Sequence, residues 1–171
     1  MAEEILNRVA NSALVTIDLE DVYPEGKRIQ LDLKDWLFEE QILIEKDFRA
    51  KLQEHSWENY KNAFVAIACS VDAIVPSWAY LLMTTYLEPF AKKIVVGDLN
   101  LLESVIFSEV IANFSLDEFK DKPVIIKGCS EKPIPDSAYT LLIQKLKPVV
   151  KSLMYGEACS NVPLYKKNKV T

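Results

Sequence analysis

Three cysteines are the residues of this chain with the clearest chemical potential. They stand at positions 69, 129 and 159, in the segments ACSVDAIVPSWAY, GCSEKPIPDSAY and ACSNVPLY. Three convergent thiolates are a suitable donor set for a soft metal ion or an iron–sulfur cluster, with one position left to a fourth group. A thiolate can also act as a nucleophile, and a free cysteine is often a buried packing residue. The position of the cysteines in the fold has to distinguish these alternatives.

A disulfide framework is a poor interpretation of these cysteines. Their number is odd, and the N-terminal segment MAEEILNRVANS is acidic and amphipathic, unlike a secretory signal or a transit peptide. No apolar run approaches the roughly 18 residues of a membrane-spanning helix. We therefore expect a cytoplasmic protein, in a compartment where thiols are kept reduced.

The cysteines accompany an internal repeat. When the chain is shifted by 59 positions, residues 56–98 align with residues 115–157 and twelve of the 43 positions are identical. Pro76, Tyr80 and Gly97 are among the residues that recur. Chance would give about two or three identities at ordinary residue abundances. We infer an internal duplication.

Each copy has the pattern helix–strand–helix–strand. The segments AFVAIAC and PVIIKGC are short apolar runs rich in Val and Ile, which is typical of strands buried on both faces. Amphipathic or well-capped segments predict helices over 45–55, 77–90, 101–114 and 136–147, with Ser77 and Asp136 as N-caps. The segments KKIVVGD and VKSLMYGE predict the second strand of each copy. This alternation predicts an α/β fold with a mainly parallel sheet flanked by helices.

The ends of the chain lie outside the repeat. After an opening helix, ALVTIDL and KRIQLDL flank the turn-forming YPEG, which predicts a β-hairpin at an edge of the sheet with a solvated acidic run, DLEDVYPE. The last residues, YKKNKVT, are polar and basic, and we expect them to be frayed. The prediction is a single domain, 1–171, made of helix and hairpin (1–38), two repeats (39–98 and 98–157) and a tail (158–171).

The repeat predicts where a site would lie. In parallel α/β sheets ligands bind beyond the carboxyl ends of the strands. Cys69 and Cys129 follow equivalent strands, and Cys159 follows the last strand directly after Glu157. We therefore predict a metal site formed by these three cysteines at one sheet edge. The candidates for a fourth ligand are His55, Asp98 and Glu157.

Two further residue types have a structural and a functional interpretation. His55 is the single histidine of the chain and ends a predicted helix, where hydrogen bonding to backbone carbonyls is the favoured role over that of a ligand or a base. Tyr80 and Tyr139 lie one turn into equivalent helices, where aromatic residues usually belong to the core. Their hydroxyl groups could instead line the site.

Composition excludes several classes of function. A formal net charge of −5 argues against nucleic acid or an anionic membrane as the main partner. The four glycines form neither a dinucleotide-binding fingerprint nor a phosphate-binding loop, and the metalloprotease motif H-E-x-x-H and the esterase motif G-x-S-x-G are absent. Nucleotide hydrolysis, zinc proteolysis and serine esterase activity are therefore not expected.

Over nearly its whole length, the chain resembles a bacterial family catalogued as domain of unknown function 2480. The segments that carry the resemblance are NRVANSALVTIDLEDVYPEG, KDWLFEEQILIEKDFR, VAIACSVDAIVPSWAY, VIIKGCSEKPIPDSAY and GEACSNVPLYKK. The resemblance implies no assigned activity. It implies a link to iron–sulfur cluster assembly, because genes of this family tend to lie near genes for that process.

The leading hypothesis is a protein that binds zinc, iron or an iron–sulfur cluster through Cys69, Cys129 and Cys159, as an accessory to iron–sulfur cluster assembly. Its partners would be the assembly proteins, with a homo-oligomer left open. One alternative is a thiol-dependent enzyme or redox sensor with an anion-binding pocket at a helix N-terminus. Another is a non-enzymatic interaction module in which the cysteines are structural. The sequence assigns no catalytic residues.

Overall fold

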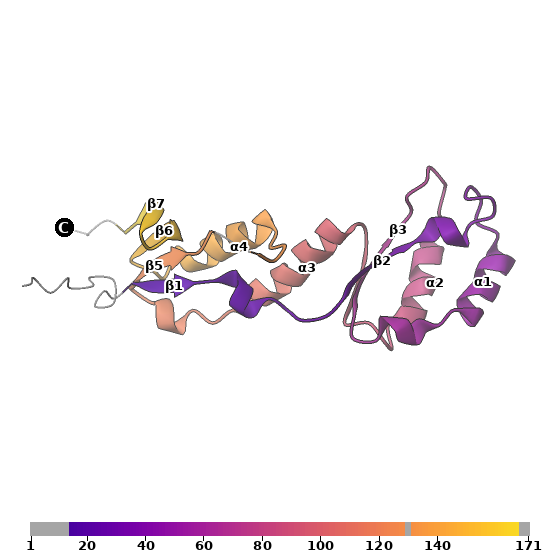
Figure 1. Cartoon of the computed structure of the whole chain (residues 1–171), viewed down its shortest axis with the longest axis horizontal. Coiled ribbons are helices and arrows are strands. Elements are labelled where there is room, and N and C mark those ends of the chain that lie inside the picture. The colour runs from indigo at the N-terminus through magenta and orange to yellow at the C-terminus, as the bar shows by residue number, and fades with distance from the viewer. Residues whose placement is uncertain (1–13, 129–130, 168–171) are drawn as a thin grey trace, which may run out of the picture. The chain divides into compact units, whose positions relative to one another are not determined.

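The computed structural model describes residues 14–128 and 131–167 (Figure 1). The opening helix predicted from MAEEILNRVANS and the predicted ligand Cys129 lie outside these residues. The chain divides into two compact units. We call Pro24–Ile106 the central unit, and we call the segments Met1–Tyr23 and Phe107–Thr171 together the terminal unit.

The central unit is built on a parallel sheet with the strand order β2-β3-β4, formed by β2 (Arg28–Asp32), β3 (Phe64–Ala68) and β4 (Lys93–Val96). One face packs on α1 (Glu45–Glu54) and α2 (Ser77–Leu87), with Phe48 and Met83 fully buried in that core. The other face packs on the first part of α3 (Leu99–Ala112) through Leu102 and Ile106. Helices therefore cover β3 on both faces, as its continuous apolar sequence requires.

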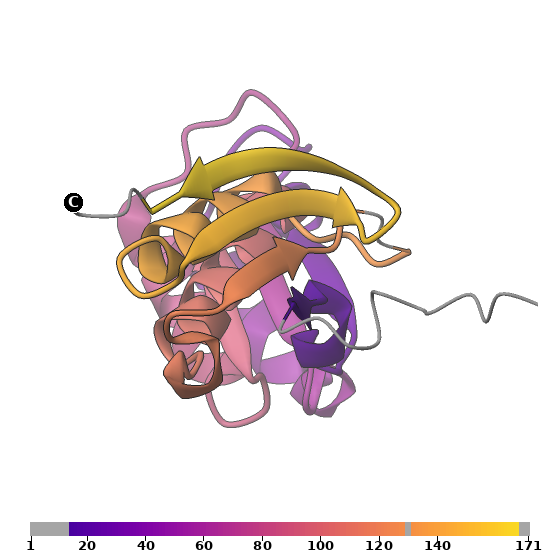
Figure 2. The same cartoon turned by 90° about the vertical axis from the view of Figure 1, so that its left-hand side faces the viewer.

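The terminal unit contains a sheet with the order β1-β5-β6-β7. Its strands β1 (Val15–Ile17), β5 (Pro123–Ile126) and β6 (Ser152–Glu157) are parallel, whereas β7 (Ser160–Lys166) is antiparallel to β6. Figure 2 shows β5, β6 and β7 side by side as a curved layer, with α4 (Asp136–Leu146) behind them. Apolar residues of α4 and of the last turns of α3 pack on this sheet.

Four short 3-10 helices complete the described elements of the two units. They are η1 (Leu19–Val22), η2 (Leu33–Trp36), η3 (Trp57–Tyr60) and η4 (Asp117–Phe119). η1 and η2 follow β1 and β2, the first strand of each unit. η3 and η4 end a few residues before β3 and β5. In both units the order of elements after the first strand is helix–strand–helix–strand.

The α/β class and the mainly parallel strand pairing are confirmed, and the four helices predicted between residues 45 and 147 form within a few residues of their expected bounds. The described strands form two sheets rather than one. The reason is that each unit buries its apolar strands and helices in a core of its own. Among the described residues, no helix combines the length and apolarity needed to cross a membrane.

The predicted N-terminal hairpin is wrong. β1 pairs with β5 and β2 pairs with β3, so the two strands belong to different sheets. Ile17 is buried in the core of the terminal unit, and Leu31 is buried in that of the central unit. The sequence of two strands joined by a turn with Pro and Gly is the same whether the strands pair with each other or with distant strands. The burial of their apolar residues determines which pairing forms.

Two predictions about chain and helix ends are also corrected. The segment expected to be a tail contains β7, which pairs along the whole of β6. The N-caps of α2 and α4 are Pro76 and Pro135, one residue before the predicted Ser77 and Asp136, and no side chain caps either helix. Proline takes this place because its extended backbone conformation leads into the helix, so that Ser77 and Asp136 become the first helical residues.

Candidate functional site

The loop that follows β3 carries Cys69, at the carboxyl end of the central sheet as predicted. The Cys69 side chain is half-buried and packs against the core of the central unit, and its Sγ atom lies 3.5 Å from the Val71 carbonyl oxygen. Burial and the neighbouring Cys69 thiol both raise the pKa of Tyr80. Residues 70–76 separate Cys69 from the start of α2 along the sequence.

Asp32, the last residue of β2, holds the start of this loop. Its Oδ1 atom accepts hydrogen bonds from the backbone N–H of Ser70 at 3.1 Å and of Lys34 at 3.0 Å. Burial opposes ionisation of the carboxyl group, but hydrogen bonds from Ser70 and Lys34 outweigh it and lower the pKa of Asp32. A charged carboxylate therefore fixes the residue that follows Cys69.

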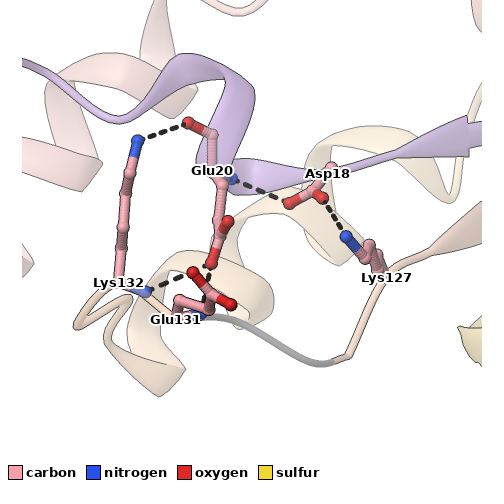
Figure 3. A network of polar contacts seen from close by, with 5 residues as sticks. All are labelled: Asp18, Glu20, Lys127, Glu131 and Lys132. Atoms are coloured by element: carbon pink, nitrogen blue, oxygen red, sulfur yellow. Dashed lines mark hydrogen bonds and ion pairs between the residues drawn. The ribbon is translucent and has the colours of Figure 1, made fainter.

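The equivalent edge of the terminal unit has a larger polar network (Figure 3). Lys127, the first residue after β5, forms an ion pair of 2.7 Å with Asp18, the first residue after β1. The Glu20 carboxylate accepts hydrogen bonds from the backbone N–H groups of Glu131 and Lys132. The Lys132 ammonium group also donates to the Glu20 carbonyl oxygen at 3.4 Å. Together these contacts attach the β5–α4 loop to η1.

The charges of this network stabilise one another. Burial disfavours the ionised form of Asp18, but hydrogen bonds from Lys127 and from the Glu20 N–H lower its pKa overall. The hydrogen bond to Asp18 and its negative charge raise the pKa of Lys127. Both groups are therefore charged at neutral pH. Their ion pair holds Lys127, the first residue of the loop that follows β5.

An aromatic pair borders the same loop. The rings of Tyr139 and Tyr155 meet edge to face with their centroids 5.8 Å apart, and the Tyr155 hydroxyl donates to the Gly128 carbonyl oxygen at 3.3 Å. A Cβ atom on Gly128 would lie 2.8 Å from the Tyr155 ring, so a larger residue there would displace that ring. Burial, with nearby acidic groups, raises the pKa of Tyr139. Tyr80 and Tyr139 thus pack on the cores and also border the cysteine loops.

Cys159 lies in the turn between β6 and β7, two residues after Glu157 ends β6. Its side chain is exposed and free. Because Ile126 of β5 pairs with Tyr155 of β6, the turn with Cys159 and the loop that leads through Gly128 to Cys129 leave the same edge of the sheet. This placement agrees with the predicted position of Cys159 at a carboxyl end.

The predicted metal ligands do not form a complete site within the described residues. Cys69 belongs to the central unit and Cys159 to the terminal unit, and Cys129 lies outside the described residues. No group of three or more His, Cys, Asp or Glu residues that could hold a metal ion occurs in residues 14–128 and 131–167. The three-cysteine site stays a prediction.

The three candidates for a fourth ligand have identifiable positions. Asp98 directly precedes α3, and its carboxylate accepts a hydrogen bond of 2.8 Å from the Leu101 N–H. Glu157 contributes to the raised pKa of Lys127 and is exposed. The backbone N–H of His55 donates to the Lys51 carbonyl as α1 ends, and the imidazole shares a hydrogen bond of 3.0 Å with the Tyr60 hydroxyl. His55 is therefore a helix-end residue whose ring bonds a side chain rather than a carbonyl.

The sequence interpretation missed the carboxylates that hold the two loops. Asp18 and Glu20 belong to the acidic run that was expected to be a solvated hairpin edge, but both bind the β5–α4 side of the sheet. The signal was present, because IDLED and LDLKD repeat the same pattern 14 positions apart. Asp18 and Asp32 occupy the same place in that pattern, and each N-caps a 3-10 helix.

Comparison with known proteins identifies one family. A family model described as Protein of unknown function (DUF2480) matches residues 3–167. The curated proteins and the solved structures give no match.

Proposed function

The chain therefore belongs to this family of unknown function, and we propose that its cysteines bind a soft metal ion or an iron–sulfur species. The observation that carries the proposal is the place of Cys159, exposed in the turn after β6. The neighbouring strand β5 ends at Ile126, which pairs with Tyr155 of β6, and Cys129 comes three residues later in the sequence.

The chemistry of the donor set supports this proposal. Thiolates favour zinc and iron–sulfur clusters over hard cations. Glu157 offers a carboxylate two residues before Cys159, and the Glu20 and Asp18 contacts hold the opposite side of the loop that contains Cys129. In this proposal Cys129 and Cys159 form the centre of the site, and the three-cysteine set stays the prediction made from the sequence.

The biological role that follows is an accessory role in iron–sulfur cluster assembly in the cytoplasm. The partners would be the proteins that assemble or receive the cluster. The family resemblance motivates this part of the proposal, and the thiols at the sheet edge supply the chemistry that it needs.

Cobalt titration tests the site residue by residue. Co²⁺ replaces Zn²⁺ in tetrahedral thiolate sites, and the intensity of its sulfur-to-metal charge-transfer absorption rises with the number of thiolate ligands. We expect saturable absorption in the reduced wild-type protein and stepwise loss in Cys69→Ser, Cys129→Ser and Cys159→Ser. Ser160→Ala is a control beside the site that keeps all three thiols. Absorption that the Cys129→Ser and Cys159→Ser variants retain in full would contradict the proposal.

A second candidate is a thiol redox function, which the exposed and free side chain of Cys159 favours. A peroxide would oxidise the Cys159 thiolate to a sulfenic acid, and attack by the Cys129 thiolate on that sulfur would release water and form a disulfide. Treatment of metal-free protein with hydrogen peroxide, followed by mass spectrometry, distinguishes the two functions. A rapid loss of two hydrogens that requires both cysteines supports the redox function, and overoxidation of Cys159 alone excludes it.

A further inference from the structure

The central unit contains a pocket that no cysteine lines. Its volume is about 430 Å³, within the range of small-molecule sites. The lining residues come from β2, η2, α1 with its C-cap, and η3: Gln30, Leu31, Asp32, Asp35, Trp36, Lys51, Glu54, His55 and Tyr60. Segments up to 30 residues apart in the sequence thus converge on one cavity.

One wall of the pocket is aromatic. Trp36 and Tyr60 are 8% and 9% exposed, and the ring centroids of Trp36 and His55 lie 5.1 Å apart. The 3.0 Å hydrogen bond between His55 Nε2 and the Tyr60 hydroxyl fixes the imidazole in this wall. Trp57 stacks behind Trp36 with a centroid distance of 5.9 Å and donates its own indole N–H to the Leu52 carbonyl oxygen.

The indole N–H of Trp36 differs from that of Trp57. It forms no hydrogen bond with any residue in the described part of the chain. Every solvent-inaccessible side-chain nitrogen or oxygen in that same part has a partner, so the Trp36 N–H must be accessible. Because Trp36 lines the pocket, this accessible N–H is a candidate donor to a ligand there.

The charges that line the pocket are mostly negative. Asp32, Asp35 and Glu54 contribute three carboxylates, against the single ammonium group of Lys51. The Lys51 ammonium group donates to the Asp35 carbonyl oxygen at 2.9 Å, and the Asp32 carboxylate is bound to two backbone N–H groups. Within residues 14–128 and 131–167, the Asp35 and Glu54 carboxylates form no ion pair. Burial lowers the pKa of His55, so the imidazole adds no positive charge at neutral pH.

We infer that this pocket binds a small organic ammonium ion that also carries a carbonyl or hydroxyl oxygen. The ammonium group lies at the mouth, where Asp35 and Glu54 compensate its charge. The oxygen accepts the hydrogen bond of the Trp36 N–H, and the apolar part of the ligand packs on the Trp36 ring, whose face also attracts a cation. The inference does not rest on the metal proposal, because no cysteine lines this pocket.

Three probes with one scaffold and different charges test this assignment. L-phenylalaninamide is a cation, N-acetyl-L-phenylalaninamide is neutral and N-acetyl-L-phenylalanine is an anion, and all three keep the ring and a carbonyl oxygen. Binding is followed by NMR, since the ring protons of His55 are the only histidine signals of the chain. We expect the cation to shift these signals saturably, the neutral probe to bind about tenfold more weakly, and the anion not to bind.

Two variants assign the contacts. Glu54→Gln should lower the affinity for the cationic probe about two- to fivefold, which is the contribution of an exposed ion pair, and should leave the affinity for the neutral probe unchanged. Glu58→Gln, an exposed position that does not line the pocket, is the matched control. Trp36→Phe keeps an aromatic ring and removes the indole N–H donor. It should lower the affinity for both the cationic and the neutral probe about threefold or more.

Three results would overturn the inference. The first is the absence of any change in the His55 signals with the cation. The second is equal affinity for the cation and the anion. The third is equal affinity of Glu54→Gln and Glu58→Gln for the cation, a comparison that does not depend on the folding of the Trp36 variant.

Discussion

At the scale of single residues, carboxylates at the end of β2 and in η1 hold the loops that follow β3 and β5. Asp32 fixes Ser70 beside Cys69, and Glu20 fixes Glu131 and Lys132 in the β5–α4 loop. The acidic composition of these positions was evident in the sequence, but their partners are more than 35 residues away. Such contacts follow from the pairing of strands, which a single sequence does not specify.

Replacement of Glu20 by Gln should loosen the β5–α4 loop. The amide oxygen is a weaker acceptor than the carboxylate, so we expect faster hydrogen exchange at the Glu131 and Lys132 amides and a loss of about 1 kcal/mol in the free energy of unfolding. Glu25→Gln, an exposed position outside this network, is the control. Unchanged exchange at both amides would show that Glu20 does not hold the loop.

The protonation of His55 should be visible in the stability of the protein. Burial lowers the pKa of His55 from 6.5. Between the folded-state pKa and pH 6.5 the unfolded chain therefore binds more protons than the folded chain. The free energy of unfolding should therefore be highest above pH 6.5 and fall as the pH decreases from there to the folded-state pKa. Urea unfolding between pH 5 and 8 measures this change, and His55→Gln should remove it. A wild-type slope that persists in the variant would assign it to another group.

At the scale of elements, the helices and buried strands were predictable, whereas the ends of the chain were not. Continuous Val- and Ile-rich runs and amphipathic segments indicated β3, β5 and the four helices. β7 was missed because most of its residues are exposed and it contains Pro163, which is typical of an edge strand. The hairpin prediction failed because local turn signals do not reveal which partner a strand chooses.

Gly156 has a specific role in the β6–β7 pair. Its φ angle is +122°, and a Cβ atom there would lie 2.6 Å from the Ser160 carbonyl oxygen. Because that neighbour is backbone, Gly156→Ala should destabilise the protein by about 2 kcal/mol, measured by urea unfolding. Gly97 has a φ angle of +152°, but its nearest contact is the flexible end of the Leu101 side chain. Gly97→Ala should therefore cost less, and the reverse order of the two costs would contradict this assignment.

At the scale of the whole molecule, the predicted duplication corresponds to a set of matched positions. Val65 pairs with Ile94 in one sheet and Val124 pairs with Leu153 in the other, in each case at the 59-residue offset found in the sequence. Positive φ angles recur at that offset as well, at Asn62 and Asp121 and at Gly97 and Gly156. The duplication stays our inference, and these matches are what it would produce.

The positions of Cys69 and Cys159 after the carboxyl ends of strands were predictable, whereas the three-cysteine site stays a prediction. A repeat of strands that end in cysteines indicated the carboxyl edges, and Cys69 and Cys159 lie there. The closure of each copy into its own sheet was not evident, because the apolar patterns of one long sheet and two short ones are alike. The pocket around Trp36 was also not predicted, since it depends on the convergence of four segments.

The most direct test of the proposed metal function is the metal content of untagged protein purified without oxygen and without chelators. The account predicts zinc, or iron with sulfide and visible absorption, close to one site per chain and absent from a triple Cys→Ser variant. Protein that contains no metal, and that binds neither zinc nor iron and sulfide on reconstitution, would contradict it.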